Sequence, residues 1–151
     1  MAKIEVELQQ SKFKDPWQRA YLNLFFTNNW IRDKTAEVFK KEDITHQQFN
    51  VLRILRGSRP NLLNAGQIKE RMVTKTPDLT RLVERLVKKG FINRTICEDN
   101  RRKVEIGITD KGLEIVEKTS AELDSRFKDI KFISEAQADE LNDLLDKLRG
   151  S

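Results

Sequence analysis

The stretch that decides the fold is residues 76–112, which read TPDLTRLVERLVKKGFINRTICEDNRRKVEIGITDKG. Its first part places apolar residues at helical spacing and polar residues on the opposite side. The apolar stripe comprises Leu79, Leu82, Val83 and Leu86, and the polar side comprises Thr80, Arg81, Glu84, Arg85 and Lys88. Thr76 followed by Pro77 is a helix-start signal, and Lys89-Gly90 is a stop signal. The pattern therefore predicts a helix from Thr76 to Gly90 with one packed face and one free face.

After Gly90 the apolar period changes from helical to two. Residues 91–96 and 104–108 alternate as strands do, and they pair naturally as a β-hairpin. The tip between them carries Asp99 and Asn100, which suffice for a turn, and also the adjacent cations Arg101 and Arg102. Because a turn does not need two arginines, we interpret them as residues that reach toward a polyanion. A further capped helix is expected directly after the second strand, from Thr109-Asp110.

The segment before this stretch contains two more predicted helices. Thr45 and Gln48 form a capping box that opens a helix through Leu55, and Gly57-Ser58-Arg59-Pro60 stops it. A short helix is expected over residues 65–72. A helix, a short helix, a capped helix and a charged hairpin together make a winged helix-turn-helix, whose second helix of the pair enters the DNA major groove. The predicted fold class is therefore mainly α with a small β-wing.

Both ends of the chain are expected to be helical. Asp15-Pro16 starts a long helix that carries apolar side chains on two sides, and Ser134 with Gln137 forms a capping box for a last helix. The two apolar rows of the first helix include Trp17, Tyr21, Phe25 and Val38 on one side and Leu22, Phe26 and Trp30 on the other. That is more apolar surface than one neighbouring helix covers, so the sequence predicts a partner chain.

The positive charge of the chain is concentrated in its middle third. The net charge is +5, from 29 Lys and Arg against 24 Asp and Glu. Residues 67–111 hold 12 of the cations and 7 of the anions, so the remaining residues are balanced. A basic segment between neutral ones is the electrostatic pattern of a polyanion-binding face, although charge alone does not separate nucleic acid from an acidic protein.

Composition excludes several classes of protein. No apolar run approaches the roughly 18 residues of a membrane span, and the start of the chain lacks a continuous apolar core of a signal peptide, so a cytoplasmic location is expected. The single cysteine, Cys97, excludes an intrachain disulfide. The sequence has no Gly-rich phosphate loop and no metal-spaced Cys/His set, so we expect neither an enzyme nor a cofactor, with carboxylate-only chemistry left open in principle.

Residues 44–112 closely resemble the MarR family of bacterial transcription regulators. The resemblance rests on ITHQQFNVLRIL, the short helix, LTRLVERLVKKGFINR, the tip EDNRRK and ITDKG, five elements at compatible spacing. It implies a homodimer with interlocked terminal helices, a winged domain on each lobe, and often a small-ligand pocket between the two regions. The expected organisation is dimerisation helices over 12–43 and 110–151 and a winged helix-turn-helix domain over 44–109. The function implied is a DNA-binding transcription regulator, expected to be a ligand-responsive repressor.

The resemblance also suggests which residues contact a pseudo-palindromic operator. The family's Asp-x-Arg wing motif falls on Asp99 and Arg101, and Arg94 matches an arginine that commonly follows the recognition helix. Pro77 departs from the small polar residue often found at the helix start. We assign base contacts to Thr80, Arg81 and Thr76, and phosphate contacts to Arg85, Lys88 and Arg102. The complete predicted DNA-binding set is Thr76, Pro77, Thr80, Arg81, Arg85, Lys88, Arg94, Asp99, Arg101 and Arg102.

Three alternatives remain open at this point. The basic face could dock an acidic protein instead of DNA, which would make the chain a winged-helix interaction module. The rings of Trp17, Tyr21, Phe25 and Trp30 could line a pocket for an apolar or aromatic effector, or they could belong to the core or the dimer interface. Cys97 could be an oxidisable switch, but a bystander thiol is favoured because the chain has no resolving cysteine.

Overall fold

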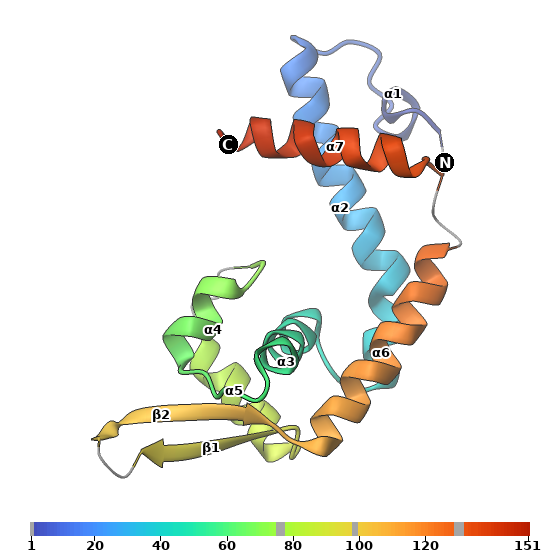
Figure 1. Cartoon of the computed structure of the whole chain (residues 1–151). Coiled ribbons are helices and arrows are strands. Elements are labelled where there is room, and N and C mark those ends of the chain that lie inside the picture. Colours follow the sequence, from blue (N-terminus) through green and yellow to red (C-terminus); the bar gives the residue numbers. More distant parts are fainter. Residues whose placement is uncertain (1, 75–77, 98–99, 129–131) are drawn as a thin grey trace.

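The computed structural model describes residues 2–74, 78–97, 100–128 and 132–151, with the backbone alone for 96–97 and 100–103. The elements follow in the order α1 (Ile4–Glu7), α2 (Pro16–Lys41), α3 (His46–Ser58), α4 (Ala65–Arg71), α5 (Leu79–Lys88), β1 (Ile92–Cys97), β2 (Asn100–Ile108), α6 (Asp110–Lys128) and α7 (Glu135–Leu148). Figure 1 shows α3, α4, α5 and the hairpin gathered into a winged lobe, which α2 and α6 connect to the part that holds α1 and α7. The predicted fold class, mainly α with a small β-wing, is confirmed.

Helix α2 is the long element that connects the two parts of the chain. The Asp15 side chain caps it by accepting a hydrogen bond from Gln18 N at 2.8 Å, and Pro16 occupies the first turn, where no N–H is needed. The helix runs to Lys41 and buries Val38 and Phe39 against the winged lobe. The Asp15 cap confirms the predicted start of the helix. The N-terminal half of α2 is largely exposed in the single chain.

Helices α3 and α4 both begin with a capping box. Thr45 Oγ1 accepts from Gln48 N at 3.1 Å, while Gln48 Oε1 accepts from Thr45 N at 2.9 Å, as the sequence predicts. Helix α3 continues to Ser58, beyond the predicted end at Leu55, because Gly57 is compatible with the helix and the stop comes only at Arg59-Pro60. The second box, which joins Asn64 to Gln67, was not predicted.

The predicted start of the helix after α4 is wrong. Helix α5 begins at Leu79, and Asp78 is its N-cap: Asp78 Oδ1 accepts from the backbone N of Arg81 at 3.4 Å. A carboxylate suits this position because it accepts a backbone N–H and also lies at the positive end of the helix dipole. The predicted helix-start residues Thr76 and Pro77 lie outside the described residues.

The predicted end of α5 at Lys89-Gly90 is confirmed. Gly90 has a φ of 73°, a left-handed conformation in which glycine carries no Cβ penalty. Phe91 N then donates to Leu86 O at 3.0 Å, which closes the last turn and turns the chain into the hairpin.

Strands β1 and β2 pair antiparallel, as predicted, with Ile92 opposite Ile108 and Arg94 opposite Ile106. The second strand is longer than predicted, since it begins at Asn100 and includes Arg101 and Arg102. Backbone hydrogen bonds, rather than apolar alternation, define a ladder, so pairing extends past the apolar part of the sequence. A register shift between Ile96 and Cys97 accompanies the change.

The hydrophobic core lies within the winged lobe and at its junction with α2 and α6. Its completely buried members include Val38, Val51, Leu52, Ile68, Leu86 and Val116. Gly112 allows α6 to approach the hairpin, because a Cβ at this position would lie 2.1 Å from Phe91 O. Helix α7, by contrast, has no buried residue. None of the described helices has the length and hydropathy required to cross a membrane.

Candidate nucleic-acid interface

Helix α5 presents a polar face on the surface of the winged lobe. Its apolar stripe is buried against the core, as predicted, and comprises Leu79, Leu82, Val83 and Leu86. The side chains predicted to contact DNA from this helix are all exposed: Thr80, Arg81, Arg85 and Lys88. The packing of one side of an amphipathic helix thus leaves three cations and a hydroxyl together on the other side.

The first turn of α5 contains a charged contact that the sequence analysis missed. Arg81 Nε lies 3.3 Å from Asp78 Oδ2, and the other oxygen of the same carboxylate caps the backbone N–H of Arg81. The signal for this pair was present, because an Asp three residues before a helical Arg is in reach of both groups. The pair was missed because the Thr76-Pro77 signal, two residues earlier, predicts a different start of the helix.

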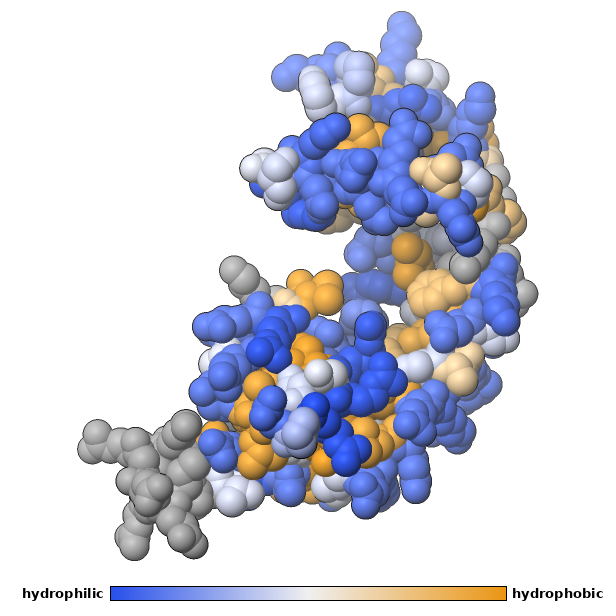
Figure 2. All heavy atoms as spheres, in the orientation of Figure 1, coloured by the Kyte–Doolittle hydropathy of each residue, from blue (hydrophilic) through white to orange (hydrophobic). Residues whose placement is uncertain are grey.

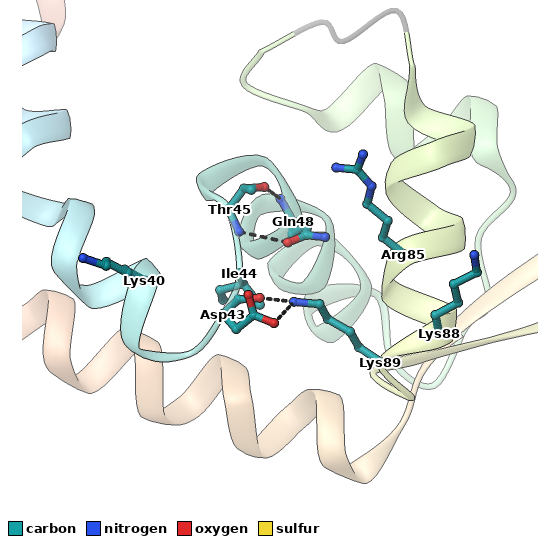
Figure 3. A pocket seen from close by; sticks show the side chains of 8 residues that line it. All are labelled: Lys40, Asp43, Ile44, Thr45, Gln48, Arg85, Lys88 and Lys89. Carbon is teal, nitrogen blue, oxygen red and sulfur yellow. Dashed lines mark hydrogen bonds and ion pairs between the residues drawn. The ribbon is translucent and has the colours of Figure 1, made fainter.

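The last turn of α5 lies beside a hollow of about 440 Å³ between α5 and the corner that joins α2 to α3. The lining residues are Lys40, Asp43, Ile44, Thr45, Gln48, Arg85, Lys88 and Lys89, shown in Figure 3. Lys89 Nζ lies 2.7 Å from Asp43 Oδ2 and is thus neutralised. In the part of the chain that the structure describes, Arg85 and Lys88 have no such partner, so their charges are available to an anion.

A second, smaller hollow of about 160 Å³ lies between the first turn of α3 and the first half of α5. Arg81 and Arg85 line it together with Asp78, Thr45 and Gln48. The two hollows share Arg85, Thr45 and Gln48 in their linings, and cations outnumber carboxylates among the residues that line them.

The wing is less completely described. Arg94 is exposed on β1, and Arg101 and Arg102 belong to the backbone ladder of β2, but their two side chains are not among those described. Asp99, the acidic residue of the Asp-x-Arg wing motif, lies outside the described residues, as do Thr76 and Pro77. Of the predicted DNA-binding side chains, those that the structure describes side by side are Thr80, Arg81, Arg85 and Lys88 on α5.

The single histidine lies at the edge of this region. His46 is the first residue of α3, and its ring meets the Phe39 ring edge to face, with 5.4 Å between the centroids. Partial burial lowers the pKa of His46, and the positive charges of Arg32 and Arg53 lower it further. Thr45 is the cap of α3, so His46 does not cap the helix, and its ring packs against Phe39 instead.

Aromatic side chains gather on the other half of α2, far from α5. Trp17, Tyr21 and Phe25 are exposed by 75%, 60% and 54% in the single chain, and Trp30 is half-buried. The rings of Tyr21 and Phe25 lie 4.7 Å apart, centroid to centroid. These four residues were predicted to line an effector pocket. The structure places Trp17, Tyr21 and Phe25 on an open face of α2 and leaves Trp30 half-buried.

No described residues form a metal site, since no group of three or more His, Cys, Asp and Glu lies close enough together in these parts of the chain.

Figure 2 shows predominantly hydrophilic residues over the visible face, with hydrophobic residues reaching the surface both in the winged lobe and around α7. The same view shows an open notch between these two parts. The described surface therefore offers a partner two kinds of contact, the cations of α5 and exposed apolar side chains.

Comparison with known proteins identifies the family. The model of the MarR family matches residues 44–104, from just before α3 to the middle of β2. The transcriptional regulator PapX of Escherichia coli is 26% identical over 103 residues, which are 68% of this chain and 63% of PapX. The chain thus spans somewhat less than two thirds of that relative.

Solved structures resemble the chain over most of its length. The crystal structure of a MarR transcription factor from Planctomyces limnophilus is 31% identical, covers 93% of this chain and 100% of its own, and superposes with a TM-score of 0.69. MepR of S. aureus, crystallised in complex with DNA, has the same fold at 22% identity, with a TM-score of 0.74 over 85% of this chain and 94% of its own. The capped helices, the wing and these matches together place the chain in the MarR family, as a winged helix-turn-helix transcription regulator.

Proposed function

We propose that the chain acts as a homodimer that binds a pseudo-palindromic operator in double-stranded DNA and represses transcription. Each protomer would insert α5 into the major groove, with the wing beside it. Two-fold symmetry requires two equivalent half-sites, whose centres lie about 34–36 Å apart, or one helical turn.

The observation that carries this proposal is the exposed face of α5. Arg81, Arg85 and Lys88 share one side of a helix whose other side is buried, so they can approach a duplex without any rearrangement of the core. Arg81, near the helix N-terminus, suits base contact, since recognition helices read bases with their first turns. Arg85 and Lys88, nearer the C-terminus, suit phosphate contact. Thr80 would contribute a hydroxyl to base or phosphate.

The remaining predicted contacts are proposed on the sequence. Thr76 and Pro77 precede α5, and Arg94, Asp99, Arg101 and Arg102 belong to the wing. A wing that lies along the minor groove meets an enhanced negative potential there, which favours an inserted guanidinium. MepR of S. aureus, which shares this fold, was crystallised in complex with DNA, and this supports DNA binding by the present chain.

Dimerisation is proposed from the apolar surface that one chain leaves uncovered. Helix α7 exposes Leu141, Leu144 and Leu148 by 45%, 56% and 56%, and the aromatic half of α2 is exposed as well. Helix α7 has 14 residues and none of them is buried, so contacts within its own chain contribute too little apolar burial to hold it in place. We therefore assign 12–43 and 110–151 to the dimer interface and 44–109 to DNA binding.

A small effector is proposed near the same helices. An apolar or aromatic compound could bind beside Trp17, Tyr21, Phe25 and Trp30 where a second chain supplies the remaining walls. Such a compound releases DNA only to the extent that it binds more tightly to a dimer whose two α5 helices no longer match consecutive grooves. In this proposal the chain needs no catalysis and no cofactor, and it works in the cytoplasm.

The decisive experiment selects duplexes from a random pool with the purified protein. The proposal expects an enriched, two-fold symmetric motif, and fluorescence anisotropy on that motif should show tighter binding than on a scrambled duplex. Arg81→Ala should weaken operator binding by about 1–3 kcal/mol and relax the sequence preference at one position per half-site.

Two results would contradict the proposal. Recovery of no motif, with equal affinity for operator-like and random duplexes, would favour the protein-docking alternative. A motif without two-fold symmetry, bound by a monomer, would remove the dimer from the mechanism.

A further inference from the structure

Asp78 engages Arg81 at two atoms. Its Oδ1 accepts from the backbone N of Arg81 at 3.4 Å, and its Oδ2 lies 3.3 Å from Arg81 Nε. One carboxylate thus caps α5 and also holds the side chain of the residue that it caps. The side chains of Arg81 and Asp78 are 76% and 50% exposed, so both remain accessible to a duplex.

The choice of Nε matters for what Arg81 can bind. A guanidinium has five N–H donors, one on Nε and four on the two terminal nitrogens. When Nε faces a carboxylate, the terminal nitrogens remain free, and they form the fork that matches O6 and N7 of guanine. In the described part of the chain no other ion pair involves Arg81.

The same carboxylate has a cost for general DNA affinity. Asp78 places a negative charge at the first turn of the helix that meets the phosphates, where it opposes binding to any duplex. Helix capping alone does not require this charge, since Asn and Ser cap as well as Asp does. The negative charge interacts favourably with the N-terminus of the helix, and through Oδ2 it also holds the Arg81 side chain.

We infer that Asp78 is a positioning residue that restrains the Arg81 guanidinium for end-on reading of one guanine in each half-site. The negative charge of Asp78 thereby lowers the affinity for any duplex, while its contact with Arg81 improves discrimination between DNA sequences. The inference rests on the proposed function, in which α5 reads operator bases. It adds a residue that does not itself touch the base.

The test is Asp78→Asn, which retains a capping oxygen but presents no carboxylate to Arg81 Nε. The urea unfolding midpoint should fall only slightly, because Asn caps a helix as well as Asp does and lacks only the charge at the helix N-terminus. Discrimination between the operator and a duplex with the guanine replaced should fall about two- to fivefold, the effect of one exposed ion pair, while affinity for random duplex rises. In an Arg81→Ala background, Asp78→Asn should cause no further loss of discrimination.

Glu84→Gln is the matched control, because Glu84 is exposed on the same helix and is in no ion pair among the described residues. It removes the same charge, so affinity for random duplex should rise, but discrimination should stay constant. Equal loss of discrimination in both variants would overturn the inference and reduce Asp78 to a general electrostatic effect.

Two other results separate this inference from the proposed function. If the unmodified protein selects an operator and Asp78→Asn discriminates as well as it does, the positioning role is wrong and the function stands. If the unmodified protein shows no preference for any duplex, the proposed function fails, and the positioning role fails with it.

Discussion

Lys89 Nζ lies 2.7 Å from Asp43 Oδ2 and also donates to the main-chain oxygen of Asp43, so the C-cap of α5 is tied to the corner between α2 and α3. Asp43 has a φ of 50°, a left-handed conformation that Asp tolerates. The adjacent Lys88 is exposed and lines the basic hollow without an ion-pair partner in the described residues. Of two neighbouring lysines, Lys89 is held in an ion pair, and the proposed contact with an anion falls to Lys88.

The first prediction concerns Lys88 and Lys89. Lys89→Met should lower the free energy of unfolding by up to about 1 kcal/mol, the upper range for a partly exposed ion pair, as measured by urea denaturation. Lys88→Met, the matched control, should leave that free energy unchanged and weaken DNA binding. A Lys88 variant as unstable as the Lys89 variant would contradict this division.

The second prediction concerns the salt dependence of DNA binding. Each phosphate contact removed should reduce the slope of log K against log salt concentration by about 0.9. Arg85→Ala and Arg102→Ala should each produce this change and weaken binding to all duplexes, because phosphate contacts carry no base information. Titrations at four or more salt concentrations measure it. An unchanged slope in either variant would remove that residue from the phosphate contacts.

The third prediction compares two helical glycines. Gly112→Ala should destabilise the protein by about 1–3 kcal/mol or more, because the new Cβ would lie 2.1 Å from Phe91 O. Gly57→Ala, in the last turn of α3, meets nothing within 4 Å and should instead stabilise by about 0.5–1 kcal/mol. Thermal and urea unfolding of both variants measure the difference. Equal effects of the two substitutions would show that α6 does not approach the hairpin this closely.

The fourth prediction concerns pH. Burial and the charges of Arg32 and Arg53 lower the pKa of His46 in the folded protein below its ordinary value of 6.5. The unfolded chain therefore binds more protons than the folded one between the lowered pKa and 6.5, and stability rises with pH in that window. The contribution of neutral His46 is complete above pH 6.5 and is lost as the pH falls through the folded pKa.

His46→Gln should reduce this pH dependence, because glutamine does not titrate. The measurement is the free energy of unfolding of both proteins from pH 5 to pH 8, where the difference between them should change on the acid side of 6.5. A constant difference across the range would mean that His46 titrates alike in the folded and unfolded chains.

The fifth prediction tests the dimer. Leu144→Asp should convert the protein to a monomer, because Leu144 is 56% exposed in one chain and the proposal buries it against a second. Sedimentation equilibrium measures the mass, and circular dichroism should show that the helical content is retained. Val73→Asp is the control, since Val73 is 82% exposed but lies between α4 and α5. A Leu144 variant that stays dimeric would place the interface elsewhere.

Much of the secondary structure could be predicted because helix caps are local. Asp15, Thr45 and Ser134 each accept a hydrogen bond from the backbone N–H three residues later, so the cap and its partner are adjacent in the sequence. The start of α5 was mispredicted for the same reason, since Thr76 and Asp78 are both capping residues and only one of them can begin the helix. The polar side of α5 followed from periodicity alone.

By itself the sequence determined most of the helices and the hairpin, the basic character of the middle third, and the face of α5 that carries its cations, because these depend on spacing within one element. Only the tertiary structure decided which cations are neutralised and which are free. Lys89 meets Asp43 across 46 residues of chain, whereas Lys88 meets no carboxylate in the described residues. Tertiary packing also decided that the core of the winged lobe is complete while α7 buries nothing, since contact between distant segments depends on the path of the whole chain.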